Sequence, residues 1–171
     1  MALLVGPANL TLRLELLEYK TGLGIEGTEV SSINHVKQII SSLAQGTGSN
    51  KVDSVYVSRQ TISGATSLDL RGSLASALDA STVTFPLVVT ILVVNNSTTT
   101  GQYVTFGEAT NPVTSFFAAS GDGIKIGPGG FIWLHSPTDG YATVAGTGDI
   151  LTLTPSSGSV DVDIFIIGRA S

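Results

Sequence analysis

Two segments of the chain carry apolar residues on both faces of the strand that each of them predicts. Residues 83–94 place Phe85, Leu87, Val89, Ile91 and Val93 on one face and Val88, Leu92 and Val94 on the other. Residues 160–167 place Val160, Val162, Ile164 and Ile166 on one face, and Phe165 and Ile167 follow Asp161 and Asp163 on the other. Each sheet of a two-layer sandwich has one face in water. A further layer must therefore cover these strands, supplied either by the N-terminal segment or by another subunit.

The composition also indicates an all-β protein. The chain has 20 glycines, 42% apolar residues and only 12% charged residues, a balance typical of many strands joined by turns. Short strands at roughly ten-residue spacing predict a β-sandwich or jelly roll over residues 51–171. We expect strands near residues 52–58, 67–70, 83–94, 102–106, 123–126, 131–136, 141–144, 150–154 and 160–167. Low charge with a mean hydropathy of +0.36 favours buried subunit surface, and hence a homo-oligomer.

Residues 1–50 differ from the rest and predict an N-terminal arm or covering segment. Residues 9–15 alternate, and the apolar positions on one face form a candidate interface: Leu10, Leu12, Leu14 and Leu16. Residues 20–27 are rich in glycine and predict a loop. After Ser31 or Ser32 as a cap, apolar residues at helical spacing (Ile33, Val36, Ile39 or Ile40, Leu43 and Ala44) predict a short helix that ends at residues 46–50.

Charge and residue usage exclude several classes of function. The net charge is −5, and the eight basic residues are scattered with no two adjacent, so we expect no direct binding of DNA or RNA and no anionic membrane partner. The absence of cysteine excludes disulfides, zinc–thiolate sites and thiol catalysis. The longest apolar run, residues 85–94, is half the length of a membrane helix. We expect no cofactor.

Four chemical alternatives have a specific residue pattern behind them. Gly22, Gly24 and Gly27 match the dinucleotide-binding fingerprint, but the preceding strand is polar on one face and no second βα unit follows. A hydrolase could use one of the two histidines, His35 or His135, but the sequence has no nucleophile elbow, the motif that would mark such an enzyme. The other two alternatives are a calcium site and a carbohydrate site.

The calcium alternative uses Asp161 and Asp163, which share a strand face; the simpler interpretation is a solvated, charged face. A carbohydrate-binding jelly roll would instead use Trp133 or Tyr141 as a stacking platform beside Asp139. Trp133 is also a candidate interface residue.

An adjacent aromatic pair, Phe116 and Phe117, lies in a connection after Asn111 and Pro112. Such a pair is either a plug over the open end of the sandwich or an exposed contact patch, and we favour the plug. Both residues remain candidates for an interface.

A characteristic order of strands and turns runs through residues 9–14, 46–53, 85–97, 126–130, 140–149 and 163–168, including the turns Gly46-Thr47-Gly48 and Gly127-Pro128-Gly129. This order resembles that of a group of small tailed-bacteriophage virion proteins. The resemblance covers most of the chain, is a pattern of strands and turns, and names no catalytic residue.

The resemblance implies a non-enzymatic structural protein. Its implied role is a capsid decoration (cement) protein, made in the host cytoplasm and bound as a homotrimer to the major capsid protein on the capsid surface of the virion. A tail, fibre or head-completion protein is the alternative within the same group. No cofactor, metal or catalytic residue is implied.

Overall fold

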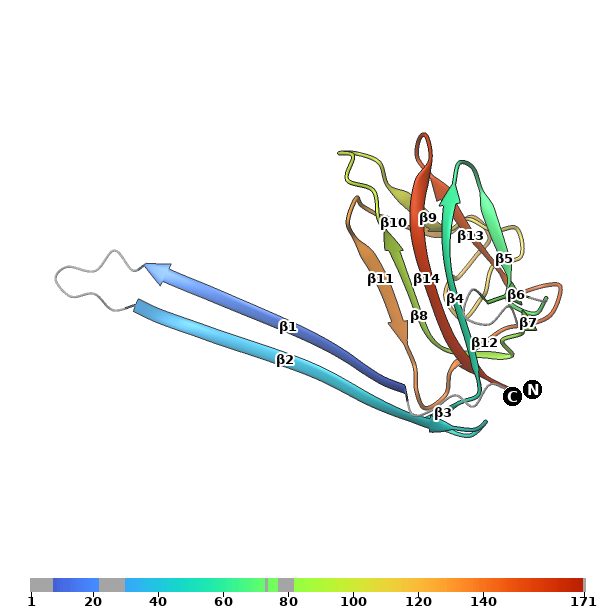
Figure 1. Cartoon of the computed structure of the whole chain (residues 1–171), viewed down its shortest axis with the longest axis horizontal. Coiled ribbons are helices and arrows are strands. Elements are labelled where there is room, and N and C mark those ends of the chain that lie inside the picture. The colour runs from blue at the N-terminus through green and yellow to red at the C-terminus, as the bar shows by residue number, and fades with distance from the viewer. Residues whose placement is uncertain (1–7, 22–29, 73, 77–81, 171) are drawn as a thin grey trace.

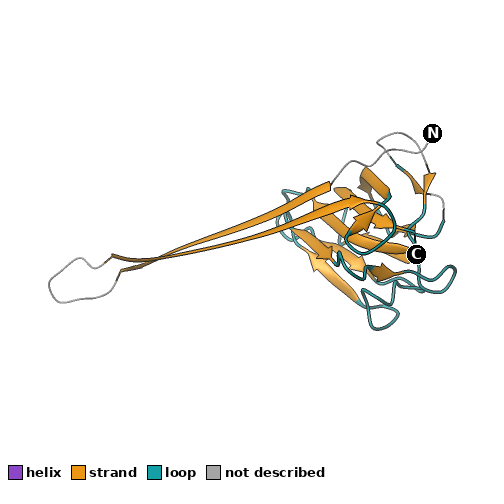
Figure 2. Cartoon of the chain, turned by 90° about the horizontal axis from the view of Figure 1, so that it is seen from below, coloured by secondary structure: helices purple, strands orange, loops and turns teal. Residues whose placement is uncertain are grey.

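The computed structural model describes residues 8–21, 30–72, 74–76 and 82–170, with residues 8–21 and 30–42 described by their backbone pairing. These residues form strands and turns, and the expected all-β class is confirmed. A sandwich of two sheets carries a long β-hairpin that extends away from it (Figures 1 and 2). None of the described residues forms a helix of the length and hydropathy needed to cross a membrane.

The strands follow one another along the chain as short elements after the initial hairpin. They are β1 (Ala8–Thr21), β2 (Val30–Gln45), β3 (Lys51–Val52), β4 (Ser54–Ile62), β5 (Thr66–Asp69), β6 (Leu74–Ala75), β7 (Thr82–Val83), β8 (Leu87–Asn95), β9 (Val104–Gly107), β10 (Gly123–Ile126), β11 (Phe131–His135), β12 (Tyr141–Ala142), β13 (Ile150–Pro155) and β14 (Val160–Arg169).

Two antiparallel sheets form the sandwich. One has the order β11-β8-β14-β4, with β12 also paired to β8, and the other has the order β10-β9-β13-β5 (Figure 1). We call the first the five-stranded sheet and the second the four-stranded sheet. Strands far apart in the chain therefore lie side by side, as β4 and β14 do over nine paired positions from Ile62 and Val160 to Ser54 and Gly168.

The main core fills the space between the two sheets. The five-stranded sheet contributes side chains such as Ile91, Val93, Ile164 and Ile166, and the four-stranded sheet contributes residues such as Val104, Phe106, Leu151 and Leu153. Along β14 the residues at 160, 162, 164 and 166 are buried, whereas 161 and 165 are exposed. The predicted faces of this strand are therefore confirmed, because a strand's side chains alternate between its two faces.

Gly168 sits where the pairing of β14 with β8 changes register. The shift falls between Ile167 and Gly168, so that Gly168 pairs with Val88. A Cβ at Gly168 would lie 2.5 Å from the Leu87 carbonyl oxygen and 2.5 Å from a ring carbon of Phe85. Glycine is therefore required here by the close approach of the two strands and of the buried Phe85 ring.

We expect Gly168→Ala to lower the free energy of unfolding by about 1–3 kcal/mol, because the added methyl group overpacks a closed contact. Urea unfolding followed by circular dichroism measures the change. Gly64→Ala is the matched control, since a Cβ at Gly64 meets no atom within 4 Å. Equal stability of the two variants would contradict the account of this contact.

The short helix expected after Ser31 or Ser32 is wrong. Residues 30–45 form strand β2, which pairs with β1 in an unbroken antiparallel register from Ala8 and Leu43 to Thr21 and Val30. The apolar spacing matched a helix, but the segment is rich in β-branched residues and serine, which favour an extended backbone. The strand expected at residues 9–15 is confirmed and continues to Thr21. Residues 22–27 of the expected glycine loop lie outside the described residues.

A single strand over residues 83–94 is also wrong, because the chain bends at Phe85 and Pro86. Strand β7 ends at Val83 and β8 begins at Leu87. The Phe85 amide donates to the Leu70 carbonyl at 2.7 Å and its ring is fully buried. Proline lacks an amide donor for a sheet ladder, which explains the break.

The base of the hairpin packs on the sandwich through a second, smaller core. Leu43, near the end of β2, is 1% exposed and clusters with Val52 of β3, Val89 of β8 and the half-buried Ile167 of β14. This cluster lies apart from the main core. The hairpin thus covers one end of the outer face of the five-stranded sheet.

Arg169 ties the base of the hairpin to the sandwich. Its buried guanidinium donates hydrogen bonds to the backbone carbonyl oxygens of Lys51, Pro137 and Thr138, at 3.4, 3.1 and 2.7 Å. The backbone N–H of Asn50 also donates to the Pro137 carbonyl oxygen at 2.8 Å. Charged donors to carbonyl oxygens form the stronger class of hydrogen bond, so these contacts fix where the hairpin leaves the sandwich.

Candidate interaction surfaces

The outer face of the five-stranded sheet is apolar across four strands. The register aligns Trp133, Leu92, Phe165 and Val57 in one row across β11, β8, β14 and β4, and Phe131 and Val94 begin the next row. We call these six residues the apolar outer face. They alternate with the core residues of the same strands, so they lie on the side of the sheet away from the four-stranded sheet.

Two phenylalanines of the apolar outer face are open to solvent. Phe131 is 58% exposed and Phe165 is 38% exposed, while Val57, Leu92, Val94 and Trp133 are half-buried. Burying a phenylalanine side chain fully contributes roughly 1.5–3 kcal/mol. A contiguous apolar face of this kind is typical of a surface that a protein partner covers.

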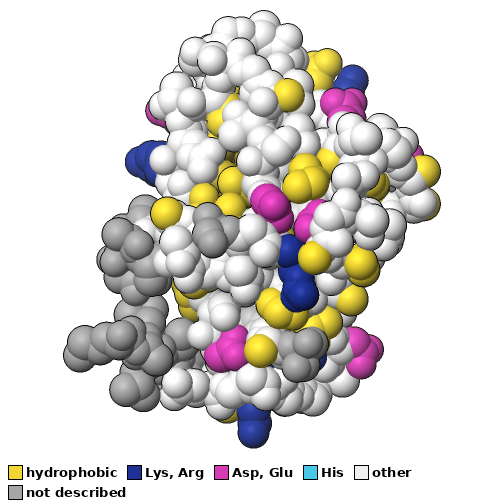
Figure 3. All heavy atoms as spheres, turned by 90° about the vertical axis from the view of Figure 1, so that its right-hand side faces the viewer, with side chains coloured by type: hydrophobic (Ala, Val, Ile, Leu, Met, Phe, Trp, Pro, Cys, Tyr) yellow, Lys and Arg dark blue, Asp and Glu magenta, His cyan; other side chains and the backbone are white. Residues whose placement is uncertain are grey.

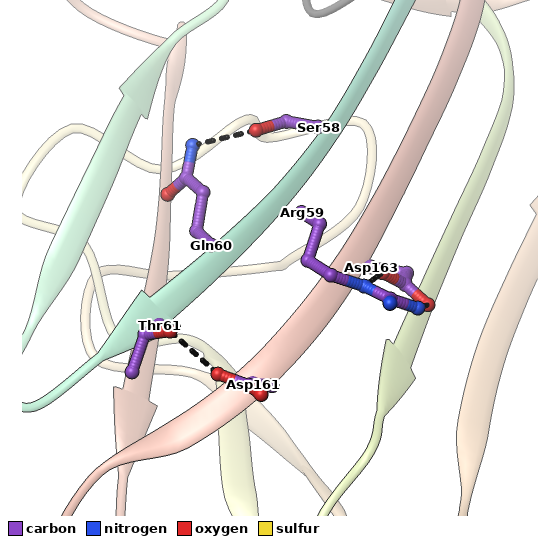
Figure 4. A network of polar contacts seen from close by, with 6 residues as sticks. All are labelled: Ser58, Arg59, Gln60, Thr61, Asp161 and Asp163. Atoms are coloured by element: carbon purple, nitrogen blue, oxygen red, sulfur yellow. Dashed lines mark hydrogen bonds and ion pairs between the residues drawn. The ribbon is translucent and has the colours of Figure 1, made fainter.

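Charged residues adjoin this face, because Asp163 and Arg59 continue the row that Phe131 and Val94 begin, and Asp161 lies in the row beyond. Arg59 donates to Asp163 through Nε at 2.5 Å and through Nη2 at 2.8 Å, and Thr61 Oγ1 donates to Asp161 at 2.5 Å, in each case from β4 to β14 (Figure 4). The hydrogen bond from Arg59 lowers the pKa of Asp163, an effect that burial opposes and that Asn96 and the charge of Arg59 reinforce. The same hydrogen bond and charge raise the pKa of Arg59.

Both aspartates are engaged by side chains of the neighbouring strand β4. The Asp163 carboxylate is engaged on both oxygens by Arg59, and Asp161 accepts from Thr61. Among the residues that the structure describes, no three acidic or histidine side chains gather at one point. The pair therefore acts as a cross-strand polar clamp on the solvent side of the sheet.

Trp133 and His135 lie next to each other at the β11 edge of the outer face. Their ring centroids are 5.9 Å apart, and His135 Nδ1 shares a hydrogen bond of 2.7 Å with the hydroxyl of the buried Thr90. Trp133 Nε1 and His135 Nε2 are enclosed and have no hydrogen-bond partner among the residues that the structure describes. Burial lowers the pKa of His135, because a charged ring here would lose its hydration.

The lowered pKa of His135 predicts a dependence of stability on pH. The unfolded chain takes up a proton at a higher pH than the folded chain does. Stability is therefore fully present above the unfolded pKa of about 6.5 and declines as the pH falls through that value toward the folded pKa. Urea unfolding at a series of pH values from about 7.5 to about 5 measures the decline.

Substituting each histidine in turn tests that assignment. We expect His135→Gln to flatten this pH dependence and His35→Gln, the control, to leave it in place. A decline that persists in His135→Gln and disappears in His35→Gln would assign the pH dependence to His35 and contradict its assignment to His135.

Phe116 and Phe117 close the sandwich from within. Phe117 is 6% exposed and belongs to the main core, and Phe116 packs against that core from a half-buried position. Their rings contact the Phe106 ring at centroid distances of 6.3 and 5.4 Å. This arrangement matches the expected plug and leaves little of Phe117 for an outside partner.

The aromatic residues considered for a carbohydrate site do not come together. The Tyr141 ring packs on Phe116 at 4.9 Å, on the core side of the sheet, whereas Trp133 belongs to the outer face. Asp139 is exposed in the turn between β11 and β12. The two candidate stacking platforms, Trp133 and Tyr141, thus lie on opposite faces of the sheet.

The hairpin forms the second candidate surface. Its register pairs Leu10 with Ser41, Leu12 with Ile39, Leu14 with Lys37 and Leu16 with His35. Paired positions share a face of a two-stranded ribbon, so positions 10, 12, 14 and 16 fall on one face together with 35, 37, 39, 41 and 43, of which 39 and 43 are apolar. We call this the leucine face. The glycines at 22, 24 and 27 lie outside the described residues.

The end of the molecule that faces away from the hairpin has a different character. Figure 3 shows a mainly uncharged polar surface there, in which apolar side chains form small separate spots and charged side chains of both signs are scattered. The two apolar surfaces defined above thus stand out against this end of the sandwich.

Comparison with known proteins adds one remote likeness. No family model and no curated protein matches the sequence. A similar solved structure is a chain titled "Cyanophage Pam1 capsid asymmetric unit", with 16% sequence identity and a TM-score of 0.24, over 74% of this chain and 90% of that chain. A likeness with that TM-score carries no argument for this chain.

Proposed function

We propose that the chain is a structural virion protein that decorates a phage capsid and stabilises it by burying surface against the major capsid protein and other copies of itself. Residues 1–50 act as the assembly arm, and residues 51–171 form the body that this arm anchors. The role needs no catalytic residue and no cofactor. The resemblance of the strands and turns to small tailed-phage virion proteins is the reason for proposing a phage particle as the assembly.

The β1–β2 hairpin is the observation that carries this proposal. It extends away from the sandwich in two perpendicular views (Figures 1 and 2), and its base, at Leu43, packs on the sandwich's second core. A two-stranded ribbon is at best marginally stable alone in water. A ribbon of this length with a leucine face is therefore an element built to lie against another protein.

The apolar outer face supports the same role. An enzyme or small-ligand module concentrates its polar groups in a concave site, whereas this sheet presents flat rows of valine, leucine and aromatic residues. Such a surface buries area and excludes water, which is what a protein that strengthens a shell must do.

The copy number in purified particles tests the proposal. We expect quantitative mass spectrometry of the phage particles to find this chain at an abundance close to that of the major capsid protein. A few to tens of copies per particle would instead indicate the tail, fibre or head-completion role. Absence from the particles would overturn the virion role altogether.

Substitutions in the hairpin test the part that it plays. We expect Leu12→Asp/Leu14→Asp to abolish binding to capsids in co-sedimentation, because two charges on the leucine face cannot be buried. Thr11→Asp/Gln38→Asp is the matched control, since positions 11 and 38 fall on the other face of the ribbon. Normal binding by Leu12→Asp/Leu14→Asp would contradict a role of the hairpin in binding to capsids.

A further inference from the structure

Beyond a role in the virion, we infer that the leucine face of one copy's hairpin lies across the apolar outer face of a second copy's five-stranded sheet. The partner of this sheet is thus the same chain, and the contact is an exchange of arms. The surface on the receiving copy is made by Val57, Leu92, Val94, Phe131, Trp133 and Phe165. The inference stands on the geometry of this chain and does not depend on a capsid.

The outer face needs a cover that its own chain does not supply. Phe131 and Phe165 remain 58% and 38% exposed with the hairpin in place. The hairpin leaves the sandwich at the base of the sheet and runs outward, beyond the β11 edge (Figure 1). A 14-residue strand spans about 45 Å at about 3.3 Å per residue, so most of the ribbon lies beyond its own sandwich.

An existing contact shows which face of the ribbon suits this sheet. Leu43 is on the leucine face by register, and it packs against Val89 and Ile167 at the lower end of the outer face. Ile167 directly follows the Phe165 row along the same side of β14. The ribbon and the sheet therefore already form one apolar interface at the base, and each surface continues past the point where the other stops.

A second copy completes both surfaces at once. The leucine positions recur every second residue along β1, and the rows of the outer face recur every second residue along β14. Two pleated surfaces with the same period pack face to face as layers of a sandwich do. The ribbon then supplies the further layer that strands apolar on both faces require.

Cysteine cross-linking between two tagged forms of the chain tests this contact, because the natural sequence has no cysteine. Leu12→Cys in one form and Phe165→Cys in the other are co-expressed and treated with a short bismaleimide. We expect a covalent pair that carries both tags. Thr11→Cys with Phe165→Cys, and Leu12→Cys with Lys125→Cys, are the controls, and we expect far less product from each.

Three results would overturn the inference. One is an internal cross-link, seen by peptide mass spectrometry in a monomeric chain that carries both Leu12→Cys and Phe165→Cys, which would place the hairpin on its own sheet. Another is cross-linking of Leu12→Cys only to itself, which would mean that two ribbons pair with each other. The third is an equal yield of cross-linked product from Leu12→Cys with Phe165→Cys and from Leu12→Cys with Lys125→Cys, when circular dichroism shows that all the forms are folded.

The mass in solution gives an independent readout without capsids. We expect light scattering to find an oligomer of the intact chain, and Phe131→Ser/Phe165→Ser to raise its dissociation constant by roughly tenfold or more. Ile124→Ser is the control, since Ile124 is also exposed, at 46%, but lies on the other sheet. A monomeric intact chain at high concentration would overturn the exchange of arms, yet leave binding to a capsid open.

Discussion

Strands β8 and β14 lie side by side in the middle of the five-stranded sheet, and both carry apolar side chains on both faces. Their inner residues, such as Ile91 and Ile164, form the main core with the four-stranded sheet. Their outer residues, such as Leu92 and Phe165, therefore need a cover of their own. The second core under Leu43 meets this need at one end of the sheet, and the rest of the outer face stays partly open.

The sequence predicted those parts of the fold that depend on local pattern. The alternation in β14 assigned each residue to its face, because a period of two has one structural meaning in a strand. Glycine-rich turns located β10, β11 and β13 to within a residue or two. The wrong helix at β2 has the opposite origin: its apolar spacing fits a helix, and the long pairing with β1, which that local pattern does not contain, makes it a strand.

Contacts between distant segments were beyond local patterns. The Arg59–Asp163 pair joins residues 104 positions apart, and the row from Trp133 to Val57 crosses four strands. The sequence predicted one face for Leu10, Leu12, Leu14 and Leu16, but the way the hairpin leaves the sandwich depends on Leu43 and on the hydrogen bonds of Arg169. Trp133 was the one residue of the outer face among the predicted interface residues. The visible signal for Leu92, Val94 and Phe165 was the two-faced hydropathy of β8 and β14.

The charges on the outer face limit where a partner can lie. Asp163 and Arg59 continue the row that Phe131 and Val94 begin, and Asp161 lies one row further from the hairpin base. Taking these charges out of water would cost free energy that an apolar ribbon cannot return. At the other end, Leu43 already fills the space over Val89 and Ile167. The surface left for a partner is the row of Trp133, Leu92, Phe165 and Val57, together with the β11 and β8 part of the next row. The sheet is thus bounded by its own charges on one side and by its own arm on the other, which gives a docked ribbon a defined position along the strands.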